Sequence, residues 1–324
     1  MGETILEVKG LQTHFFTDDG EIPAVNKVDF HVDKGEVLGI VGESGSGKSV
    51  TSLSVMGLVP KPPGKIVGGE INFKDENLVN ASEKRMRQIR GNEIAMIFQE
   101  PMTSLNPVFT IGNQLIEAIR LHNKWDKKKA KARAVEILKL VGLPRAEELI
   151  DEYPHQLSGG MRQRVMIAMA MACDPEVLIA DEPTTALDVT IQAQILELMK
   201  DLNKNRGTAI MLITHDLGVV AEMCQRVAVM YSGNIVEEGT VKQIFKEPKH
   251  PYTVGLIKSV PDMTSKRERL YSIPGSVQKP GSIKVGCPFA PRCEHAFDRC
   301  VSETPALLEA GDEGQKVSCW LHHD

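Results

Sequence analysis

The sequence predicts an α/β fold in which helices cover a parallel sheet, with antiparallel strands before it and a small cysteine-bearing extension after it. Three observations lead to this prediction. A glycine-rich loop over residues 42–49 separates an apolar run from a helical run, and apolar strands then alternate with helical segments as far as residue 240. Beyond that point prolines and glycines become frequent, and four of the six cysteines lie there. A chain of 324 residues has room for two domains.

Residues 4–35 alternate apolar with polar side chains and carry turn signals at Asp18-Asp19-Gly20 and Lys34-Gly35. This pattern predicts antiparallel strands. Phe15 and Phe16 close the first run, where an aromatic ring could stack on an adenine or simply cover the apolar face of the sheet. We select Phe15 as the candidate for the adenine contact, with Phe16 as the alternative.

The loop Gly42-Glu43-Ser44-Gly45-Ser46-Gly47-Lys48-Ser49 fits the pattern that cradles phosphates, because its glycines let backbone N–H groups converge on an anion. The apolar run 37–41 predicts a buried strand, and residues 50–58 predict a helix whose N-terminus faces the phosphates. Lys48 is expected to reach the β- and γ-phosphates, and the Ser49 hydroxyl to bind Mg²⁺. The loop residues expected to bind nucleotide are Gly42, Ser44, Gly45, Gly47, Lys48 and Ser49.

Further strands and helices follow the loop. After a turn at residues 61–64, the pattern predicts a short strand over 68–73, a charged helix over 81–90 and an apolar strand over 93–98. Apolar side chains then recur at helical spacing, as at Ile111, Leu115 and Ile119, which predicts a helical subdomain over about 107–165. Apolar strands are expected at 177–180, 209–213 and 227–231.

Polar side chains at the ends of these strands are the candidates for chemistry. Asp181 and Glu182 follow a buried strand, at the edge where parallel sheets bind ligands. Asp181 is therefore expected to hold Mg²⁺, and Glu182 to act as a general base towards water. Gln99 could ligate Mg²⁺ or orient water, and His215 could contact the γ-phosphate. The alternatives are a helix cap for the two carboxylates and ordinary strand-end positions for Gln99 and His215.

The run Leu157-Ser158-Gly159-Gly160-Met161 precedes a helix rich in Ala and Met. Locally it is a helix N-cap with two permissive glycines. A Ser hydroxyl and bare amides at a helix N-terminus also form an anion site, so Ser158, Gly159 and Gly160 could bind a nucleotide. Because the loop at 42–49 already holds one nucleotide, the ligand of this second site would have to come from another subunit.

Together these motifs resemble the ATP-binding-cassette (ABC) ATPases. Residues 157–164 are similar to the signature motif of that family, Ala186-Leu187-Asp188 to its D-loop and Thr214-His215-Asp216 to its switch histidine, all in the family's order. The resemblance covers residues 5–240. It implies an ABC-type P-loop NTPase fold with a parallel core sheet, an antiparallel β subdomain and a helical subdomain. It also implies ATP hydrolysis and includes Asp188 among the nucleotide-binding residues.

Other motifs narrow the resemblance. Residues 99–107, 161–171 and 188–194 are similar to those of bacterial dipeptide and oligopeptide importer ATPases, and His250-Pro251-Tyr252-Thr253 with the cysteine-bearing tail resembles their C-terminal extension. We therefore expect a nucleotide-binding domain over residues 1–240 and an importer extension over 241–324. Related members handle nickel or glutathione, and these substrates remain alternatives to peptides.

The resemblance also implies partners. A second cassette, either a paralogue or another copy, would dimerise head to tail with this one, so that Ser158, Gly159 and Gly160 of one complete the ATP site held by Lys48 of the other. ATP binding would close the dimer and hydrolysis would reopen it. The loop 99–107 and the helices after it would dock onto two transmembrane permease subunits, and an extracytoplasmic binding protein would deliver the substrate.

Cys287, Cys293, Cys300 and Cys319 are separated by 5, 6 and 18 residues, which fits neither the common zinc spacing nor the bacterial ferredoxin run. Four neighbouring thiols in a reducing compartment still indicate a metal site, which would cross-link a tail with a small core. We expect a [4Fe-4S] cluster, supported by the resemblance of the tail to that of the importers. Zn²⁺, free thiols and disulfides are the alternatives.

Charge and hydropathy restrict the function further. The 38 Lys and Arg against 43 Asp and Glu give a net charge of -5, which disfavours broad nucleic-acid binding. No signal peptide or apolar run of about 18 residues occurs, so we expect a peripheral subunit at the cytoplasmic face of the bacterial inner membrane. The single cassette disfavours a soluble ABC ATPase of translation or DNA repair. The presence of Lys48 and Glu182 disfavours a purely regulatory module, because a module that does not hydrolyse ATP need not keep them.

Overall fold

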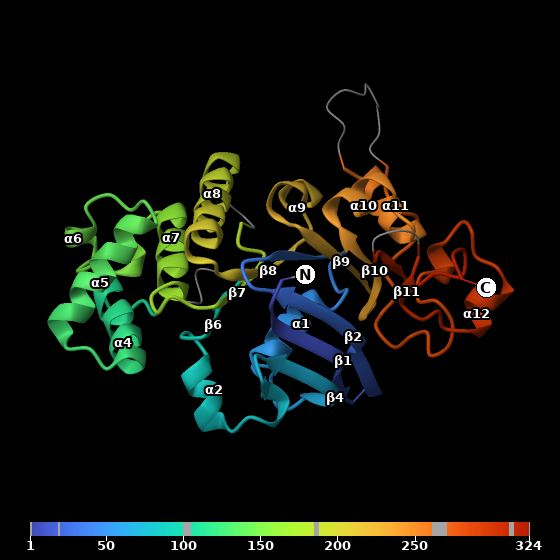
Figure 1. The fold of residues 1–324 in the computed structure, drawn as a ribbon, viewed down its shortest axis with the longest axis horizontal. Coiled ribbons are helices and arrows are strands. Elements are labelled where there is room, and N and C mark those ends of the chain that lie inside the picture. Colours follow the sequence, from blue (N-terminus) through green and yellow to red (C-terminus); the bar gives the residue numbers. More distant parts are fainter. Residues whose placement is uncertain are drawn as a thin grey trace. The chain divides into compact units, whose positions relative to one another are not determined.

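The computed structural model describes residues 2–18, 20–99, 105–184, 188–260, 271–310 and 314–323. The chain divides into two compact units, and Figure 1 labels their elements where there is room. The first unit comprises Met1–Ile5, Asp33–Glu36 and Ala81–Met211. The second comprises Leu6–Val32, Val37–Asn80 and Leu212–Asp324. The domain boundary expected at residue 240 is a different division, and it stays a prediction.

The first unit is mainly helical. Its helices are α2 (Glu83–Ile89), α4 (Ile111–Asn123), α5 (Lys127–Leu140), α6 (Ala146–Leu149), α7 (Gly159–Ala170) and α8 (Val189–Arg206). Thr110 caps α4 by accepting a hydrogen bond from the Asn113 N–H, and Ile111, Leu115 and Ile119 of that helix are fully buried. The helices expected after residue 107 are therefore confirmed, and Figure 1 shows α4 to α7 grouped together.

Two parallel strands belong to the same unit, β6 (Ile94–Ile97) and β7 (Val177–Asp181). Every residue of both strands is buried, as expected for a parallel sheet covered on both faces. Their register pairs Ile97 with Ala180, so the two strands end at the same edge. Gln99 and Glu182, which follow β6 and β7, are thereby brought to that edge.

The second unit contains an antiparallel sheet in the order β2-β1-β4-β5. Its strands are β1 (Thr4–Thr17), β2 (Gly20–Asp33), β4 (Gly64–Phe73) and β5 (Glu76–Asn77). The predicted strand over 68–73 was too short, because Gly64 already pairs with Phe15 of β1 and β4 begins there. Helix α1 (Lys48–Val55) is tied to this sheet by a buried hydrogen bond of 2.8 Å between the Thr13 and Ser54 hydroxyl oxygens.

A second sheet of this unit runs in the order β11-β12-β10-β9-β3. Its strands are β3 (Val37–Val41), β9 (Arg226–Tyr231), β10 (Asn234–Thr240), β11 (Leu308–Glu309) and β12 (Lys316–Val317). β3 and β9 are parallel, whereas β10 pairs antiparallel with both β9 and β12. Strand β8 (Ala209–Thr214) has residues in both units and is followed by α9 (Leu217–Met223).

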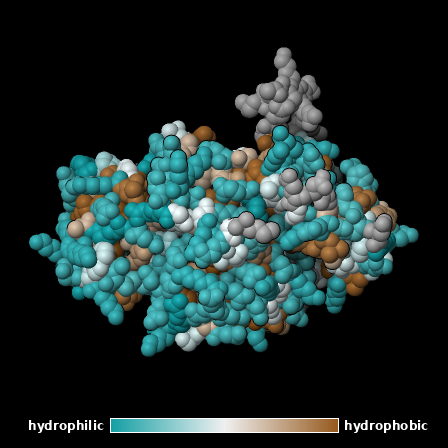
Figure 2. All heavy atoms as spheres, in the orientation of Figure 1, coloured by the Kyte–Doolittle hydropathy of each residue, from teal (hydrophilic) through white to brown (hydrophobic). Residues whose placement is uncertain are grey.

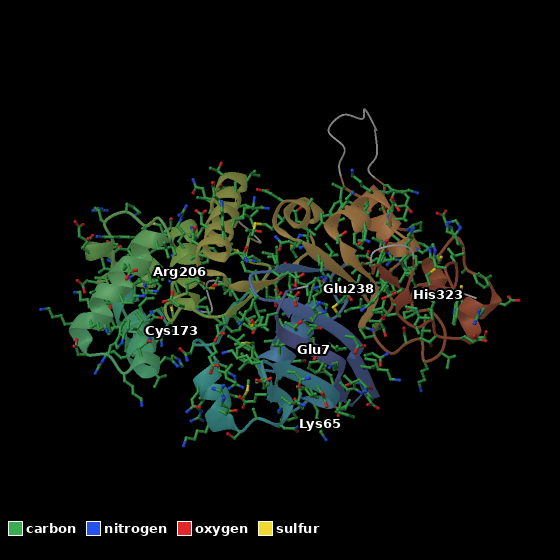
Figure 3. The ribbon with its side chains drawn as sticks, in the orientation of Figure 1. Glu7, Lys65, Cys173, Arg206, Glu238 and His323 are labelled. Carbon is green, nitrogen blue, oxygen red and sulfur yellow. The ribbon has the colours of Figure 1, made fainter. Side chains whose placement is uncertain are left out.

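The extension contains only short helices among its described residues: α10 (Val241–Lys246), α11 (Pro251–Lys258) and α12 (Asp298–Ser302). The frequent prolines and glycines of this region account for the shortness of these helices, because both residue types interrupt a helix. Glu237 of β10 is fully buried and fastens the extension to the sheet. It accepts hydrogen bonds from the N–H groups of Lys249 and His250 and from the Gln315 amide. The neighbouring Glu238, labelled in Figure 3, pairs with Arg226 of β9.

None of the helices in the described segments is long and apolar enough to cross a bilayer. The face drawn in Figure 2 is largely hydrophilic, with hydrophobic side chains in separate patches.

Candidate functional site

The phosphate-binding loop lies between β3, whose five residues are all buried, and α1. Helix α1 begins at Lys48, two residues earlier than expected. The buried Lys48 ammonium donates hydrogen bonds to the carbonyls of Gly42, at 2.7 Å, and Glu43, at 3.0 Å. The Ser46 hydroxyl is buried, and within the described residues it has no hydrogen-bond partner. A buried hydroxyl without a hydrogen-bond partner and an ammonium held at the loop are what an anion-binding site requires.

Two glycines of the loop could not be replaced without moving the backbone. A Cβ at Gly42 would lie 2.2 Å from the Met230 carbonyl oxygen, and one at Gly47 would lie 2.5 Å from the Ala24 carbonyl oxygen. Gly47 also has a φ of 104°, which L-residues rarely adopt. Ser44 and Gly45 are exposed at the tip of the loop, and Ser49 is half-buried in the first turn of α1.

The structure distinguishes the two candidate aromatic rings. Phe15 is half-buried and pairs with Gly64 of β4, whereas Phe16 is 49% exposed. Because side chains alternate along a strand, Phe15 shares a face with Thr13, which contacts Ser54 of α1. Phe15 therefore lies on the α1 side of the sheet, which favours Phe15 over Phe16 as the candidate.

His215 follows β8 and is exposed. It lines an open pocket of about 250 Å³ together with Gly42 and Glu43 of the phosphate-binding loop. Leu256 and Ser259, from α11 and its C-terminus, lie on the same pocket. The structure thus places the predicted γ-phosphate contact beside the predicted phosphate loop.

In the first unit, the two strand ends bring the predicted base and the predicted glutamine together. Asp181 is buried at the end of β7, and Glu182 follows it with a φ of 47°. The Gln99 amide donates a hydrogen bond of 3.1 Å to the Glu182 carboxylate. A left-handed backbone costs a non-glycine residue about 1 kcal/mol or more, and such strain concentrates at functional sites.

The serine-glycine motif stands at the start of α7. The Ser158 hydroxyl accepts a hydrogen bond of 3.3 Å from the Met161 N–H, so Ser158 is the N-cap that local reasoning predicts. Ser158 and Gly159 are exposed, and a Cβ at Gly159 would meet no atom within 4 Å. Gly160 faces Ile191 of α8, whose N-cap is the exposed Asp188. Ser158 therefore caps helix α7, and the surface at Gly159 is open to a ligand.

The four cysteines of the tail come together. Cys287, Cys293, Cys300 and Cys319 all line one small cavity, with His250, Phe289 and Trp320 among its other walls. All four are free thiols, so no disulfide joins them. Burial, together with the other three thiols, raises the pKa of Cys287 to about 11. Among the described residues, no group of three or more His, Cys, Asp or Glu side chains is arranged to hold a metal ion.

Sequence reasoning missed two residues that touch the phosphate-binding loop. The Arg292 guanidinium forms an ion pair with the Glu43 carboxylate at 2.7 Å, and the Tyr252 hydroxyl accepts a hydrogen bond of 2.8 Å from the Glu43 N–H. Tyr252 stood in a motif that drew notice only for its resemblance, and no pattern in the sequence links Arg292 to the phosphate-binding loop. Residues 100–104 and 185–187, which include Ala186 and Leu187 of the expected D-loop, lie outside the described residues.

Two family models match the chain. The model described as ABC transporter covers residues 25–185, and the model described as the C-terminal region of oligopeptide/dipeptide transporters covers residues 236–300. The first includes the phosphate-binding loop, the serine-glycine motif and Asp181. The second includes three of the four tail cysteines.

Curated relatives match almost end to end. The oligopeptide transport ATP-binding protein AppD of Bacillus subtilis is 56% identical, over 99% of this chain and 98% of its own. The dipeptide transport ATP-binding protein DppD of Haemophilus influenzae is 52% identical, over 97% of this chain and 94% of its own. The solved dimer of MJ0796, a bacterial ABC transporter cassette, is 28% identical over 73% of this chain and 98% of its own, with a TM-score of 0.66. The chain therefore belongs to the ABC ATPases, within the group of oligopeptide and dipeptide transport ATP-binding proteins.

Proposed function

We propose that this ABC ATPase powers the import of dipeptides or oligopeptides across the bacterial inner membrane. The observation that carries the proposal is the near-complete alignment with peptide-transport ATP-binding proteins, which extends through the C-terminal region. A solved neighbour of the same fold is described as a post-hydrolysis state bound to ADP and Pi, which agrees with turnover of ATP.

The proposed chemistry is an attack by water on the γ-phosphate. Glu182 would take a proton from that water, and the Gln99 amide, which donates to Glu182, would orient the carboxylate or the water. His215 would contact the γ-phosphate, and its place on one pocket with Gly42 supports this role. Positioned groups of this kind lower the barrier because the charge that develops finds its partners already in place.

The remaining contacts would bind the nucleotide. Lys48 would exchange its two loop carbonyls for phosphate oxygens, and the loop amides would surround the same anion. Phe15 would stack on the adenine. The Ser49 hydroxyl and the Asp181 carboxylate are the oxygen donors proposed for Mg²⁺, with Gln99 as a further ligand. When bound, the ion would offset phosphate charge.

A second cassette would complete the ATP site. The exposed Ser158, Gly159 and Asp188, together with the half-buried Gly160, would meet the nucleotide held by the Lys48 of the partner. The open surface at Gly159 supports this arrangement, because bare N–H groups at a helix N-terminus favour an anion. Two permease subunits and an extracytoplasmic binding protein are the other proposed partners, which would hold the chain at the cytoplasmic face of the membrane.

The function is tested by purifying the chain with its permeases and reconstituting the assembly in vesicles. Uptake of labelled dipeptides and oligopeptides should require ATP and the cognate binding protein. Labelled nickel and glutathione serve as competing substrates. ATP-dependent uptake of either one, without uptake of peptides, would contradict the proposed substrate class.

We further propose that the four tail thiols hold a [4Fe-4S] cluster. The support is chemical: four unpaired cysteines line one cavity, and thiolates are the usual ligands of such clusters. The four thiols are not arranged to hold a metal ion in the described structure, so binding of a cluster would require the cysteine side chains to reorient around the cavity. The cluster would cross-link segments of a tail whose own core consists of only a few residues.

The cofactor is tested on protein purified without oxygen. Analysis should give about four iron and four sulfide per chain, with broad absorption near roughly 400 nm. One zinc per chain without sulfide would replace the cluster by a structural zinc site.

A further inference from the structure

One residue of the phosphate-binding loop is held by the C-terminal extension. The Glu43 carboxylate accepts hydrogen bonds from both terminal nitrogens of Arg292, at 2.7 and 3.2 Å. Its backbone N–H donates to the Tyr252 hydroxyl at 2.8 Å. Both partners lie more than 200 residues further along the chain. The extension thus contacts the side chain and the main chain of the same loop residue.

These contacts are rigid. The Arg292 side chain is 3% exposed, and it also donates to the carbonyls of Pro274 and Ile273. Tyr252 is fully buried and packs edge-on against Tyr231, with ring centroids 4.7 Å apart. Because neither side chain has room to reorient, each holds Glu43 in one place. The ion pair is bidentate and its Arg292 side is buried, so it is stronger than an ordinary pair between two exposed side chains.

The residue that they hold bears directly on the nucleotide site. The Glu43 carbonyl accepts hydrogen bonds from the Lys48 ammonium, at 3.0 Å, and from the Ser46 N–H, at 3.2 Å. Fixing the Glu43 N–H and carboxylate therefore also fixes the part of the loop that Lys48 contacts. In addition, Glu43 places a negative charge on a loop that must receive a polyanion, and Arg292 compensates that charge.

We propose that Arg292 and Tyr252 are positioning residues of the ATP site and make the C-terminal extension part of the nucleotide-binding machinery. Arg292 neutralises the Glu43 carboxylate and holds it in place, and Tyr252 orients the Glu43 peptide. Neither residue touches the reacting atoms, so their loss weakens nucleotide binding far more than the chemical step.

The test uses the full chain in its assembled transporter and measures the ATP dependence of hydrolysis. Arg292→Met should raise KM for ATP about tenfold and change kcat less than about twofold. Tyr252→Phe, which removes one oxygen and keeps the packing, should raise KM about threefold. Adding Glu43→Gln to Arg292→Met removes the uncompensated charge and should restore most of the lost affinity.

Arg299→Met is the matched control, because Arg299 precedes Cys300 as Arg292 precedes Cys293, but pairs with Glu303. An equal rise in KM for this control would assign the effect to general damage of the tail and overturn the proposal. A KM for ATP of the double variant that is as high as that of Arg292→Met would also overturn the proposal. If Arg292→Met does not fold, Tyr252→Phe decides: an unchanged KM overturns the proposal, and a raised KM with an unchanged melting temperature supports it.

Discussion

Replacing Glu237 with Gln tests how the extension is fastened to the sheet. One carboxylate oxygen accepts from the Lys249 N–H and the Gln315 amide, both at 2.8 Å, and the other accepts from the His250 N–H at 2.9 Å. Glutamine has nearly the same shape but only one acceptor oxygen. Whichever way its amide turns, an NH₂ group must face at least one buried N–H donor.

Two opposing effects set the magnitude. Losing one charge-assisted hydrogen bond and weakening the other two costs about 3 kcal/mol. Removing a buried charge relieves a desolvation penalty, which acts in the opposite direction. Because three donors already solvate the carboxylate, we expect the lost bonds to dominate, with a net cost of about 2 kcal/mol or more. That corresponds to roughly a 30-fold rise in the equilibrium constant for local opening of the segment before α11.

Hydrogen exchange measured by mass spectrometry gives this quantity directly. Peptides covering residues 247–254 should exchange roughly 30-fold faster in the variant, while peptides from α4 should not change. Glu309→Gln, at an exposed position of β11, is the control and should leave exchange unaltered. Equal or slower exchange in Glu237→Gln would show that relief of desolvation outweighs the lost bonds, and would refute the reasoning.

Three further predictions concern the nucleotide site. Glu182→Gln should lower ATP turnover about 1000-fold and keep ATP-dependent dimerisation in the assembled complex, and near-normal hydrolysis would remove Glu182 from the role of base. Gly42→Ala should abolish binding of a fluorescent ATP analogue, because its Cβ would lie 2.2 Å from the Met230 carbonyl oxygen. The same change at Gly45, where a Cβ meets nothing within 4 Å, should lower the affinity for the analogue less. Thr13→Val should cost about 1 kcal/mol in chemical denaturation and leave KM for ATP unchanged, because Ser54 keeps its bond to the Val50 carbonyl. A decrease of more than about 3 kcal/mol in the free energy of unfolding would mean that the hydroxyl pair contributes more than one local hydrogen bond.

The sequence predicted those parts of the fold that depend on local patterns. The run Val37–Val41 is a strand with every residue buried, and Ile111, Leu115 and Ile119 lie on the buried face of a helix. Apolar periodicity is enough for such elements, because burial selects one face of each. The phosphate-binding loop was equally visible, since few arrangements of chain need glycines and a lysine at those spacings.

Contacts between distant residues were only partly accessible. Gln99 and Glu182 could be expected to meet, because both follow parallel strands and the carboxyl ends of such strands share an edge. No comparable rule links Glu43 with Arg292, which lie 249 residues apart. Similarly, the start of β4 at Gly64 depends on the partner strand, because Phe15 pairs with it, whereas glycine alone indicates a turn.

The same limit explains why the extension resembled a separate appendage in the sequence. Its prolines and glycines predict short elements, and they say nothing about where those elements attach. In the structure β12 pairs with β10, and Glu237 on β10 accepts from the N–H groups of Lys249 and His250. His250 is the N-cap of the helix that carries Tyr252 to the phosphate-binding loop. A chain cut after residue 240 would therefore lose the donors that solvate Glu237 and the two side chains that hold Glu43.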